Sequence, residues 1–564
     1  MIGRPLLPAD APCNIARALV EMAERQPETP AIYYPEKRRG DGTRDYSRYT
    51  YRELDDRSDA IARGLQAVGI GPGVRTALMV RPSLDFFALF FGMFKAGAVP
   101  VLVDPGIGIK RLKECLDEAE PTAFVGIPVA QLARVLLGWG KKTIKTRVTV
   151  GRRWLLGDVT LDDAIATGAA GAGQWQMAET RAGELAAILF TSGSTGVPKG
   201  VMYEHRHFAA QVELIRTAYD IQPGEIDLPT FPPFALFDPA LGMTTVIPEM
   251  DPTRPASVNP DNLFEAVRTF GVTNLFGSPA LLDTVSRAGA ARGVKLPTLK
   301  RVISAGAPVS PEVMARMLSL LPDGARIHTP YGATECLPVA TVDSALILSE
   351  ARAKTAAGAG VCVGTPLVQN DVRVIRCDDG PIEAWRAELE VPSGEVGEIT
   401  VRGPTTTQAY YGRAASTALA KIRHPDDPEG WLRHRMGDLG YFDADGRLWF
   451  CGRKSHRLET QAGPMYTVPC EMVFNAHPAV RRSALVGVPA GDDVRPVILI
   501  ERDAAGPELS EAALVAELRA LAERFPHTRR IDTFLTHPAF PVDIRHNAKI
   551  DRPQLAQWAA RRLK

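Results

Sequence analysis

The segment TSGSTGVPKG (residues 191–200) follows the apolar run LAAILF (185–190) and combines three glycines, four hydroxyl residues and one lysine. Glycine, serine and threonine in a tight loop leave backbone N–H groups free and add hydroxyl donors, and the lysine adds a positive charge. The segment therefore predicts an anion-binding loop suited to phosphate groups rather than a plain surface turn. A Walker A loop is excluded because Pro198 and Gly200 stand where it needs glycine and Ser/Thr.

The regions around this loop alternate between short apolar runs and stretches of helical periodicity. Thr50 and Glu53 have the spacing of a helix capping box. The run DFFALFFGMFKAGAVPVLV (85–103) contains Lys95 and is too broken for a membrane span, so it predicts a buried helix followed by a buried strand. Further buried strands are expected in residues 74–80, 122–127, 147–151, 185–190, 273–279 and 299–306. This β-α-β alternation predicts parallel sheet.

The pattern changes after about residue 430, where Asp-Gly and glycine turns separate short strands. One amphipathic helix is expected within residues 508–525. We therefore expect a large N-terminal α/β domain with parallel and mixed sheets at residues 1–452. A small α+β C-terminal domain is expected at residues 453–564.

Charge and cysteine content exclude several classes of partner. The chain has 66 basic and 65 acidic side chains, so its overall charge favours neither a nucleic acid nor an anionic membrane as partner. Its seven cysteines are scattered without a C-x-x-C pair, which argues against a disulfide framework and a structural zinc site. The N-terminal residues do not look like a signal peptide. We expect a cytoplasmic protein.

Taken in order along the chain, the motifs resemble those of the acyl-adenylate-forming enzymes, which include acyl-CoA synthetases, nonribosomal adenylation domains and luciferases. The resemblance covers nearly the whole chain. Beside the loop at 191–200, the matching segments are YTYREL (49–54), FKAGAVPVLVDP (94–105), SAGAP (304–308), YGATE (331–335), GEITVRG (397–403), RMGDLGY (435–441), GRKSHRL (452–458) and PVDIRHNAKIDR (541–552).

The resemblance implies ATP as a substrate, Mg²⁺ as a cofactor and a mobile C-terminal domain. The β- and γ-phosphates would be held by Thr191, Ser192, Gly193, Ser194, Thr195, Gly196 and Lys199. The rest of the nucleotide site would be formed by Gly306, Ala307, Pro308, Tyr331, Gly332, Thr334, Asp438 and Arg453. Within this set, Tyr331 would stack on adenine, Thr334 would meet the α-phosphate and Asp438 would bind the ribose hydroxyls.

The catalytic set implied by the resemblance is Lys549, Glu335 and Thr195. Lys549 would bridge the substrate carboxylate and the α-phosphate, and Glu335 would bind Mg²⁺. The aromatic stretch FPPFALFDPALG (231–242) could be core, but its position in the family favours an acyl pocket lined by Phe231, Phe234 and Phe237.

The pair His205 and His207 could form half of a metal site. No third ligand is evident in the sequence, so we expect these two side chains to pack beside the loop instead.

The hinge departs from the usual pattern of the superfamily. Ser455 stands where an acidic hinge residue is expected, and Glu459 stands where a lysine is expected. A carboxylate at that place disfavours recruitment of the anionic coenzyme A. These departures resemble the branch of the superfamily that forms β-lactones in bacterial long-chain olefin biosynthesis.

That resemblance implies adenylation of a 2-alkyl-3-hydroxyalkanoic acid, followed by attack of its own 3-hydroxyl and release of AMP. Other enzymes of the same olefin pathway are candidate partners, and His456 is a candidate base for the hydroxyl. Two alternatives remain: an acyl-CoA or acyl-carrier ligase with a divergent hinge, and a non-catalytic nucleotide- or acyl-binding protein.

Overall fold

The computed structural model describes residues 3–40, 42, 44–153, 159–171, 175–191, 197–427, 429–542 and 550–563. Six of the expected site residues lie outside these ranges: Ser192, Gly193, Ser194, Thr195, Gly196 and Lys549.

A seven-stranded sheet carries the predicted phosphate loop, and its strand order is β7-β6-β5-β3-β4-β8-β9. All neighbours are parallel except the antiparallel pair β8 and β9. The strands are β3 (Arg75–Met79), β4 (Val99–Leu102), β5 (Ala123–Gly126), β6 (Thr146–Thr149), β7 (Val159–Thr160), β8 (Leu185–Phe190) and β9 (Gly200–Glu204).

Helices cover this sheet in two separate apolar clusters. One cluster contains α1 (Arg17–Arg25), α2 (Tyr51–Ala67), α3 (Leu84–Lys95) and α6 (Leu161–Ala170). The other contains α4 (Ile109–Ala119) and α5 (Pro128–Leu137). Right-handed crossovers place α4 and α5 on the same face of the sheet, because both connections move across it in the same direction.

A larger sheet runs β17-β18-β20-β21-β16-β15-β14-β13-β12-β10-β11-β1-β2, with β19 paired to β20. It is parallel from β11 through β10, β12 and β13 to β14, and antiparallel from β14 to β17. The strands are β1 (Pro30–Arg38), β2 (Arg44–Thr50), β10 (Ile226–Pro229), β11 (Thr244–Val246), β12 (Asn274–Phe276), β13 (Arg301–Ile303), β14 (Arg326–Ala333), β15 (Cys336–Asp343), β16 (Val361–Pro366), β17 (Asp371–Ile375), β18 (Gly397–Arg402), β19 (Lys421–Ile422), β20 (Arg433–Phe442) and β21 (Leu448–Arg453).

The helices connected to this sheet are mostly short. They are α7 (His205–Tyr219), α8 (Pro232–Ala235), α9 (Asp238–Leu241), α10 (Pro260–Phe270), α11 (Pro279–Ala291), α12 (Pro311–Leu318), α13 (Ser344–Leu346), α14 (Arg352–Ala356) and α15 (Ala414–Ala420).

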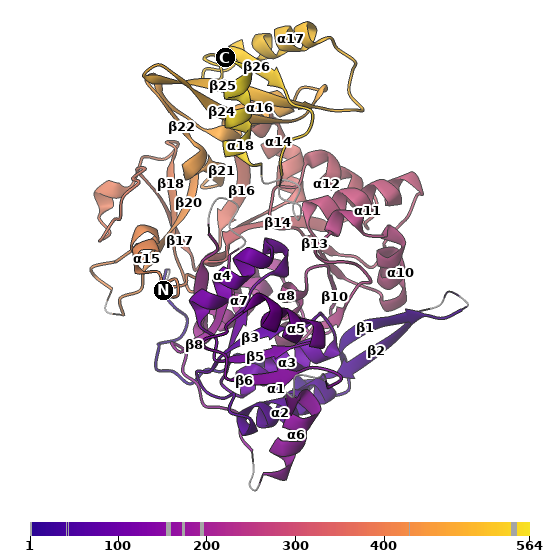
Figure 1. The fold of residues 1–564 in the computed structure, drawn as a ribbon. Coiled ribbons are helices and arrows are strands. Elements are labelled where there is room, and N and C mark those ends of the chain that lie inside the picture. Colours follow the sequence, from indigo (N-terminus) through magenta and orange to yellow (C-terminus); the bar gives the residue numbers. More distant parts are fainter. Residues whose placement is uncertain are drawn as a thin grey trace.

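The C-terminal region is smaller and lies at the end of the molecule farthest from α6 (Figure 1). Its elements are β22 (Leu458–Thr460), β23 (Gly463–Met465), α16 (Thr467–Asn475), β24 (Val480–Ala490), β25 (Asp493–Arg502), α17 (Glu511–Glu523), β26 (Thr533–Thr536) and α18 (Arg552–Arg562). The expected fold class is therefore confirmed: a large α/β region with mixed sheets precedes a small α+β region. The boundary between residues 452 and 453 stays a prediction.

Several local predictions are also confirmed. Thr50 and Glu53 form a complete capping box at the start of α2. Helix α3 is buried, and the Lys95 ammonium lies 2.5 Å from one carboxylate oxygen each of Asp55 and Asp59, so its charge is compensated inside the core. None of the described helices combines the length and the apolar content that a membrane crossing needs. All seven cysteines are free thiols.

A buried polar cluster lies at the amino ends of β10, β12 and β13. Asn274 donates a hydrogen bond to Asp227, and Thr245 donates one of 2.8 Å to Asp238. Burial raises the pKa of Asp227 to about 7, and burial together with the neighbouring Asp227 charge raises the pKa of Asp238 well above its ordinary value. Both carboxyl groups therefore keep their protons to a higher pH than exposed aspartates do.

This pair predicts a specific pH dependence of stability. Between about pH 4 and pH 7 the folded protein binds more protons than the unfolded chain, so the free energy of unfolding falls as pH rises across this window. Each unit of pKa shift corresponds to about 1.4 kcal/mol. Asp238→Asn should flatten this slope, measured by chemical denaturation from pH 4.5 to 8. The exposed Asp323→Asn should reproduce the wild-type slope; parallel profiles for all three proteins would contradict the prediction.

Candidate active site

Several of the predicted site residues lie at one edge of the larger sheet. The strands β10, β12, β13 and β14 are parallel, so their carboxyl ends lie side by side. The aromatic segment 231–237 follows β10, the turn 304–308 follows β13, and Tyr331 lies in the last part of β14. Ligands of α/β proteins bind in the crevice outside the carboxyl ends of such strands.

The base of the predicted phosphate loop is well defined. The Thr191 N–H donates to the Lys199 carbonyl at 3.0 Å, and the Lys199 N–H donates to the Thr191 hydroxyl at 3.2 Å. These bonds extend the antiparallel pair of β8 and β9. Thr191 and Lys199, the described residues that flank this loop, are therefore paired at the carboxyl end of β8.

Tyr410 connects this loop to the YGATE segment. The Lys199 ammonium lies 4.9 Å from the centre of the Tyr410 ring, a cation–π contact. The Tyr410 hydroxyl donates a hydrogen bond of 2.6 Å to Oε1 of Glu335. Burial and the Glu335 charge raise the pKa of Tyr410, so the phenol stays protonated and can act as this donor. Sequence reasoning missed Tyr410; the aromatic pair before Gly412 was its only signal.

The backbone of Glu335 is held from a second side. Thr407 donates to the Glu335 carbonyl through its N–H at 2.9 Å and its hydroxyl at 3.0 Å. Lys421 in turn donates to the Thr407 carbonyl and is buried. Burial lowers the pKa of Lys421 to about 8, a shift that the Glu335 charge opposes. Buried contacts thus fix the position of Glu335.

The YGATE segment also meets the RMGDLGY segment. The Tyr331 hydroxyl donates a hydrogen bond of 2.8 Å to Oδ2 of Asp438. Asp438 stands opposite Arg453 in the β20–β21 pair, and their charged groups are 2.8 Å apart. Burial raises the pKa of Asp438, whereas the Asp438 charge raises the pKa of Arg453. The three side chains thus form one linked group.

Backbone constraints shape the rest of this edge. A β-carbon on Gly332 would lie 2.8 Å from the Cys336 carbonyl oxygen, so the tight β14–β15 connection requires glycine. The Thr334 carbonyl accepts a hydrogen bond of 2.5 Å from Tyr203. In the turn at 304–308, Gly306 has a φ of +95°, and Ala307 and Pro308 follow it.

The three expected pocket phenylalanines are half-buried. The rings of Phe231 and Phe234 are 5.5 Å apart, and Phe234 lies 4.2 Å from Phe276 at the end of β12. Phe237 instead approaches Phe208 of α7 at 6.5 Å. Phe231 and Phe234 thus lie over the carboxyl ends of β10 and β12, and Phe237 belongs to a neighbouring aromatic group.

His205 and His207 pack in the interior, as expected. The His205 ring accepts the Ile15 N–H at 3.3 Å, and the His207 ring accepts the Glu204 N–H at 2.8 Å. Burial lowers the pKa of His205 to about 4 and that of His207 to about 3. The described residues contain no group of three or more His, Cys, Asp or Glu side chains that could hold a metal ion.

The hinge segment, which departs from the superfamily pattern, is held by local contacts. In the hinge, Ser455 lies in a short 3₁₀ turn (Lys454–His456), and the exposed Glu459 carboxylate pairs with Arg457 at 2.5 Å. Burial lowers the pKa of the neighbouring His456 to about 4, so its ring is neutral at pH 7.

The segment that contains Lys549 is closed at its base by a bridge between Val542 and Ile550. Next to this bridge, Arg552 pairs with the buried Glu471 at 2.7 Å. The described residues on either side of residues 543–549 are therefore paired with each other, and Arg552 connects them to α16.

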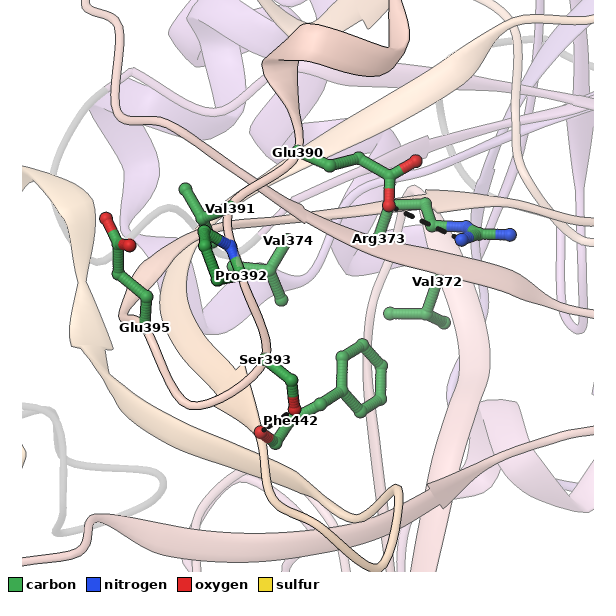
Figure 2. A pocket seen from close by; sticks show the side chains of 9 residues that line it. All are labelled: Val372, Arg373, Val374, Glu390, Val391, Pro392, Ser393, Glu395 and Phe442. Atoms are coloured by element: carbon green, nitrogen blue, oxygen red, sulfur yellow. Dashed lines mark hydrogen bonds and ion pairs between the residues drawn. The ribbon is translucent and has the colours of Figure 1, made fainter.

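A separate pocket of about 170 Å³ lies away from these residues, between β17 and the segment 390–395. Figure 2 shows Glu390 paired with Arg373 on one side and the Phe442 ring directed toward Val372 on the other. None of the predicted site residues lines this pocket.

Comparison with known proteins places this arrangement in a family. Residues 19–411 match the family described as AMP-binding enzyme. The chain is 55% identical over 550 residues to an olefin beta-lactone synthetase from Xanthomonas campestris pv. campestris, covering 97% of this chain and 98% of the relative. It is 54% identical to an olefin beta-lactone synthetase from Stenotrophomonas maltophilia, covering 98% and 99%.

More distant proteins share the fold. A long-chain-fatty-acid–CoA ligase from Escherichia coli is 26% identical, with 83% of this chain and 84% of the relative covered. The solved structure of an amide bond synthetase from Marinactinospora thermotolerans superposes with a TM-score of 0.76 at 23% identity, covering 97% of this chain and 99% of that one. This chain belongs to the AMP-binding enzyme family.

Proposed function

We propose that the protein uses ATP to adenylate a 2-alkyl-3-hydroxyalkanoic acid and then closes the adenylate to a β-lactone, with release of pyrophosphate and AMP. The observation that carries the proposal is the 55% identity, over 97% of the chain, with an olefin beta-lactone synthetase. We also propose that the enzyme acts in the cytoplasm in olefin biosynthesis, beside other enzymes of that pathway, and that residues 453–564 form its mobile domain.

In the first step, a carboxylate oxygen of the acid attacks the α-phosphorus of ATP, and pyrophosphate leaves. Thr191, Lys199 and the loop between them would bind the β- and γ-phosphates, and Lys549 would bridge the carboxylate and the α-phosphate. Tyr331 would place the adenine next to Asp438, whose carboxylate would accept hydrogen bonds from the ribose. The turn at 306–308, Gly332 and Thr334 would complete the nucleotide site.

Glu335 fits the role of the protein ligand of Mg²⁺. Its Oε1 is occupied by Tyr410, whereas Oε2 has no hydrogen bond in the part of the chain that the structure describes. Mg²⁺ is usually held by one or two carboxylates together with phosphate oxygens, which agrees with the absence of a larger cluster of metal-binding side chains among the described residues. Bound there, the ion would neutralise phosphate charge.

In the second step, the substrate's 3-hydroxyl oxygen attacks the acyl carbonyl, the bond to AMP breaks, and the hydroxyl proton is lost. This nucleophile is already part of the bound molecule, so no second substrate has to enter. The hinge supports this choice, because Glu459 presents an exposed carboxylate where coenzyme A ligases have a lysine. Phe231 and Phe234 would contact the alkyl chain.

The identity of the nucleophile can be tested with two acids. A 2-alkyl-3-hydroxy acid should give AMP, pyrophosphate and a β-lactone at a rate that added coenzyme A does not change. The same acid without the 3-hydroxyl should stop after about one pyrophosphate per active site, since a closed site excludes water. Mass spectrometry of both reactions is the measurement; rapid formation of a coenzyme A thioester from the deoxy acid would favour an acyl-CoA ligase.

Glu335 and Tyr410 should act together on the metal. Glu335→Gln keeps the shape but loses the charge, and should raise the Mg²⁺ concentration for half-maximal adenylation and lower turnover. Tyr410→Phe keeps the ring under Lys199 but removes the hydrogen bond to Glu335, and should raise the same concentration by roughly tenfold. Pyrophosphate release titrated against Mg²⁺ measures both effects; unchanged Mg²⁺ dependence in both variants would place the metal elsewhere.

Lys549 should matter for chemistry and not for folding. Lys549→Ala should lower the rate of adenylate formation by about two to three orders of magnitude, the usual cost of removing a group that stabilises transition-state charge. The thermal unfolding midpoint should stay that of the wild type. The exposed Lys37→Ala, on β1, serves as the matched control. A Lys549→Ala enzyme with near wild-type adenylation would remove this residue from the mechanism.

A further inference from the structure

Helix α5 has an apolar outward side, although its inward side also packs apolar residues (Ala130, Ala133 and Leu137) on the core. Besides these apolar residues, the inward side buries two polar ones, Gln131 and Arg134, which are 1% and 9% exposed. Its outward side carries Val129 and Leu136, which are 53% and 74% exposed, and Val135 next to them. A surface helix normally buries its apolar residues and exposes its polar ones.

Specific contacts fix the helix in this orientation. Gln131 donates a hydrogen bond of 3.1 Å to the Val148 carbonyl of β6. Arg134 donates to the Gln131 side chain at 3.3 Å, and its guanidinium lies 5.8 Å from the Phe124 ring of β5. Rotating α5 to bury Val129 and Leu136 would break these contacts and expose two satisfied polar groups. The contacts of Gln131 and Arg134 therefore keep the apolar side of α5 exposed to solvent.

The apolar exposure is concentrated on one face of the molecule. Nine large apolar side chains are exposed in the described part of the chain, and four of them lie on α4 or α5: Ile109, Val129, Val135 and Leu136. Both helices cover the same face of the seven-stranded sheet and share one apolar cluster. We call the outward surface of α4, α5 and the turn at 138–145 the α4–α5 face; both helices are labelled in Figure 1.

The same face is basic, although the whole chain is nearly neutral. Residues 109–145 contain seven lysines and arginines, of which only Arg134 is buried, and four acidic residues. Lys141, Lys142 and Lys145 follow α5 directly, and Lys110 and Arg111 lie in the first turn of α4. All five side chains are exposed, and none has an ion-pair partner among the described residues. The balanced total charge conceals this local excess.

We propose that the α4–α5 face docks the enzyme on the surface of a lipid bilayer that contains anionic phospholipids. Exposed aliphatic side chains flanked by lysines are the pattern of interfacial membrane binding: the apolar groups enter the boundary of the acyl region, and the ammonium groups bind phosphate headgroups. A protein partner would have to supply an acidic apolar surface.

The position of the face agrees with this docking. The first turns of α4 and α5 lie at the carboxyl edge of their sheet, the edge from which Thr191 emerges. In Figure 1 the C-terminal region lies at the opposite end of the molecule from α6, and α4 and α5 lie between the two. This inference concerns binding and does not depend on which acid the enzyme activates.

The test is sedimentation of the purified full-length protein with vesicles, with no substrate present. The wild type should bind vesicles of phosphatidylglycerol and phosphatidylethanolamine, and should bind phosphatidylcholine vesicles at least tenfold more weakly. Raising the salt concentration should release it, because headgroup attraction is screened. Absence of binding to the anionic vesicles at 50 mM salt would overturn the proposal.

Matched variants separate the two contributions. Leu136→Gln with Val129→Thr should weaken vesicle binding at least tenfold, while Val368→Thr, at a site 83% exposed and outside the face, should have no effect. Lys142→Gln should weaken it about fivefold, and Lys37→Gln should not. Thermal unfolding checks that each variant is folded. Equal vesicle binding by the face variants and the control variants would overturn the proposal. Self-association of the wild type that Leu136→Gln abolishes would also overturn it, because the face would then bind a second copy of the chain.

Discussion

The backbone contact between β9 and the segment 405–411 holds the two large sheets together at the candidate site. Val201 of β9 forms a bridge with Tyr410, and the Tyr411 N–H donates to the Gly200 carbonyl at 2.8 Å. From the same segment, Thr407 binds the backbone of Glu335. This short stretch of chain therefore connects β9 to the YGATE segment of the other sheet, in addition to the direct hydrogen bond from Tyr203 of β9 to the Thr334 carbonyl.

Polar groups at the two ends of the parallel strands in the larger sheet differ in whether a ligand can reach them. At the amino ends, the carboxyl groups of Asp227 and Asp238 are buried against each other and against Asn274, so no ligand can reach them. At the carboxyl ends, Glu335 retains a carboxylate oxygen without a hydrogen bond among the described residues. Polar groups satisfied inside the fold contribute to stability, whereas those left available can bind a ligand.

Much of the fold followed from local patterns in the sequence. The apolar runs at 74–80, 98–104 and 122–127 became β3, β4 and β5, and the capping box began α2 at the expected residue. These features depend on residues close together in the chain. The β1–β2 hairpin that joins the larger sheet was not anticipated, because its pairing with β11 connects residues more than 200 positions apart.

The same distinction applies to the site. Motif spacing identified the segments that the structure brings together, including Tyr331 with Asp438, whose hydroxyl and carboxylate are 107 residues apart in sequence. It could not identify Tyr410 or Lys421, since their importance comes from contacts with Glu335 and Thr407 across the fold. The exposed apolar side of α5 could not be predicted either, because periodicity gives the spacing of apolar residues but not the direction in which they point.

The proposed chemistry and the altered hinge are physically consistent with each other. A ligase that transfers its acyl group to coenzyme A needs a cationic surface to receive an anionic second substrate, and Glu459 with Arg457 leaves that part of the hinge without a free positive charge. An internal hydroxyl needs no such surface. It needs an adenylate held long enough for ring closure. Loss of the cation therefore removes a competing reaction without weakening the proposed one, because the attacking oxygen arrives already bound.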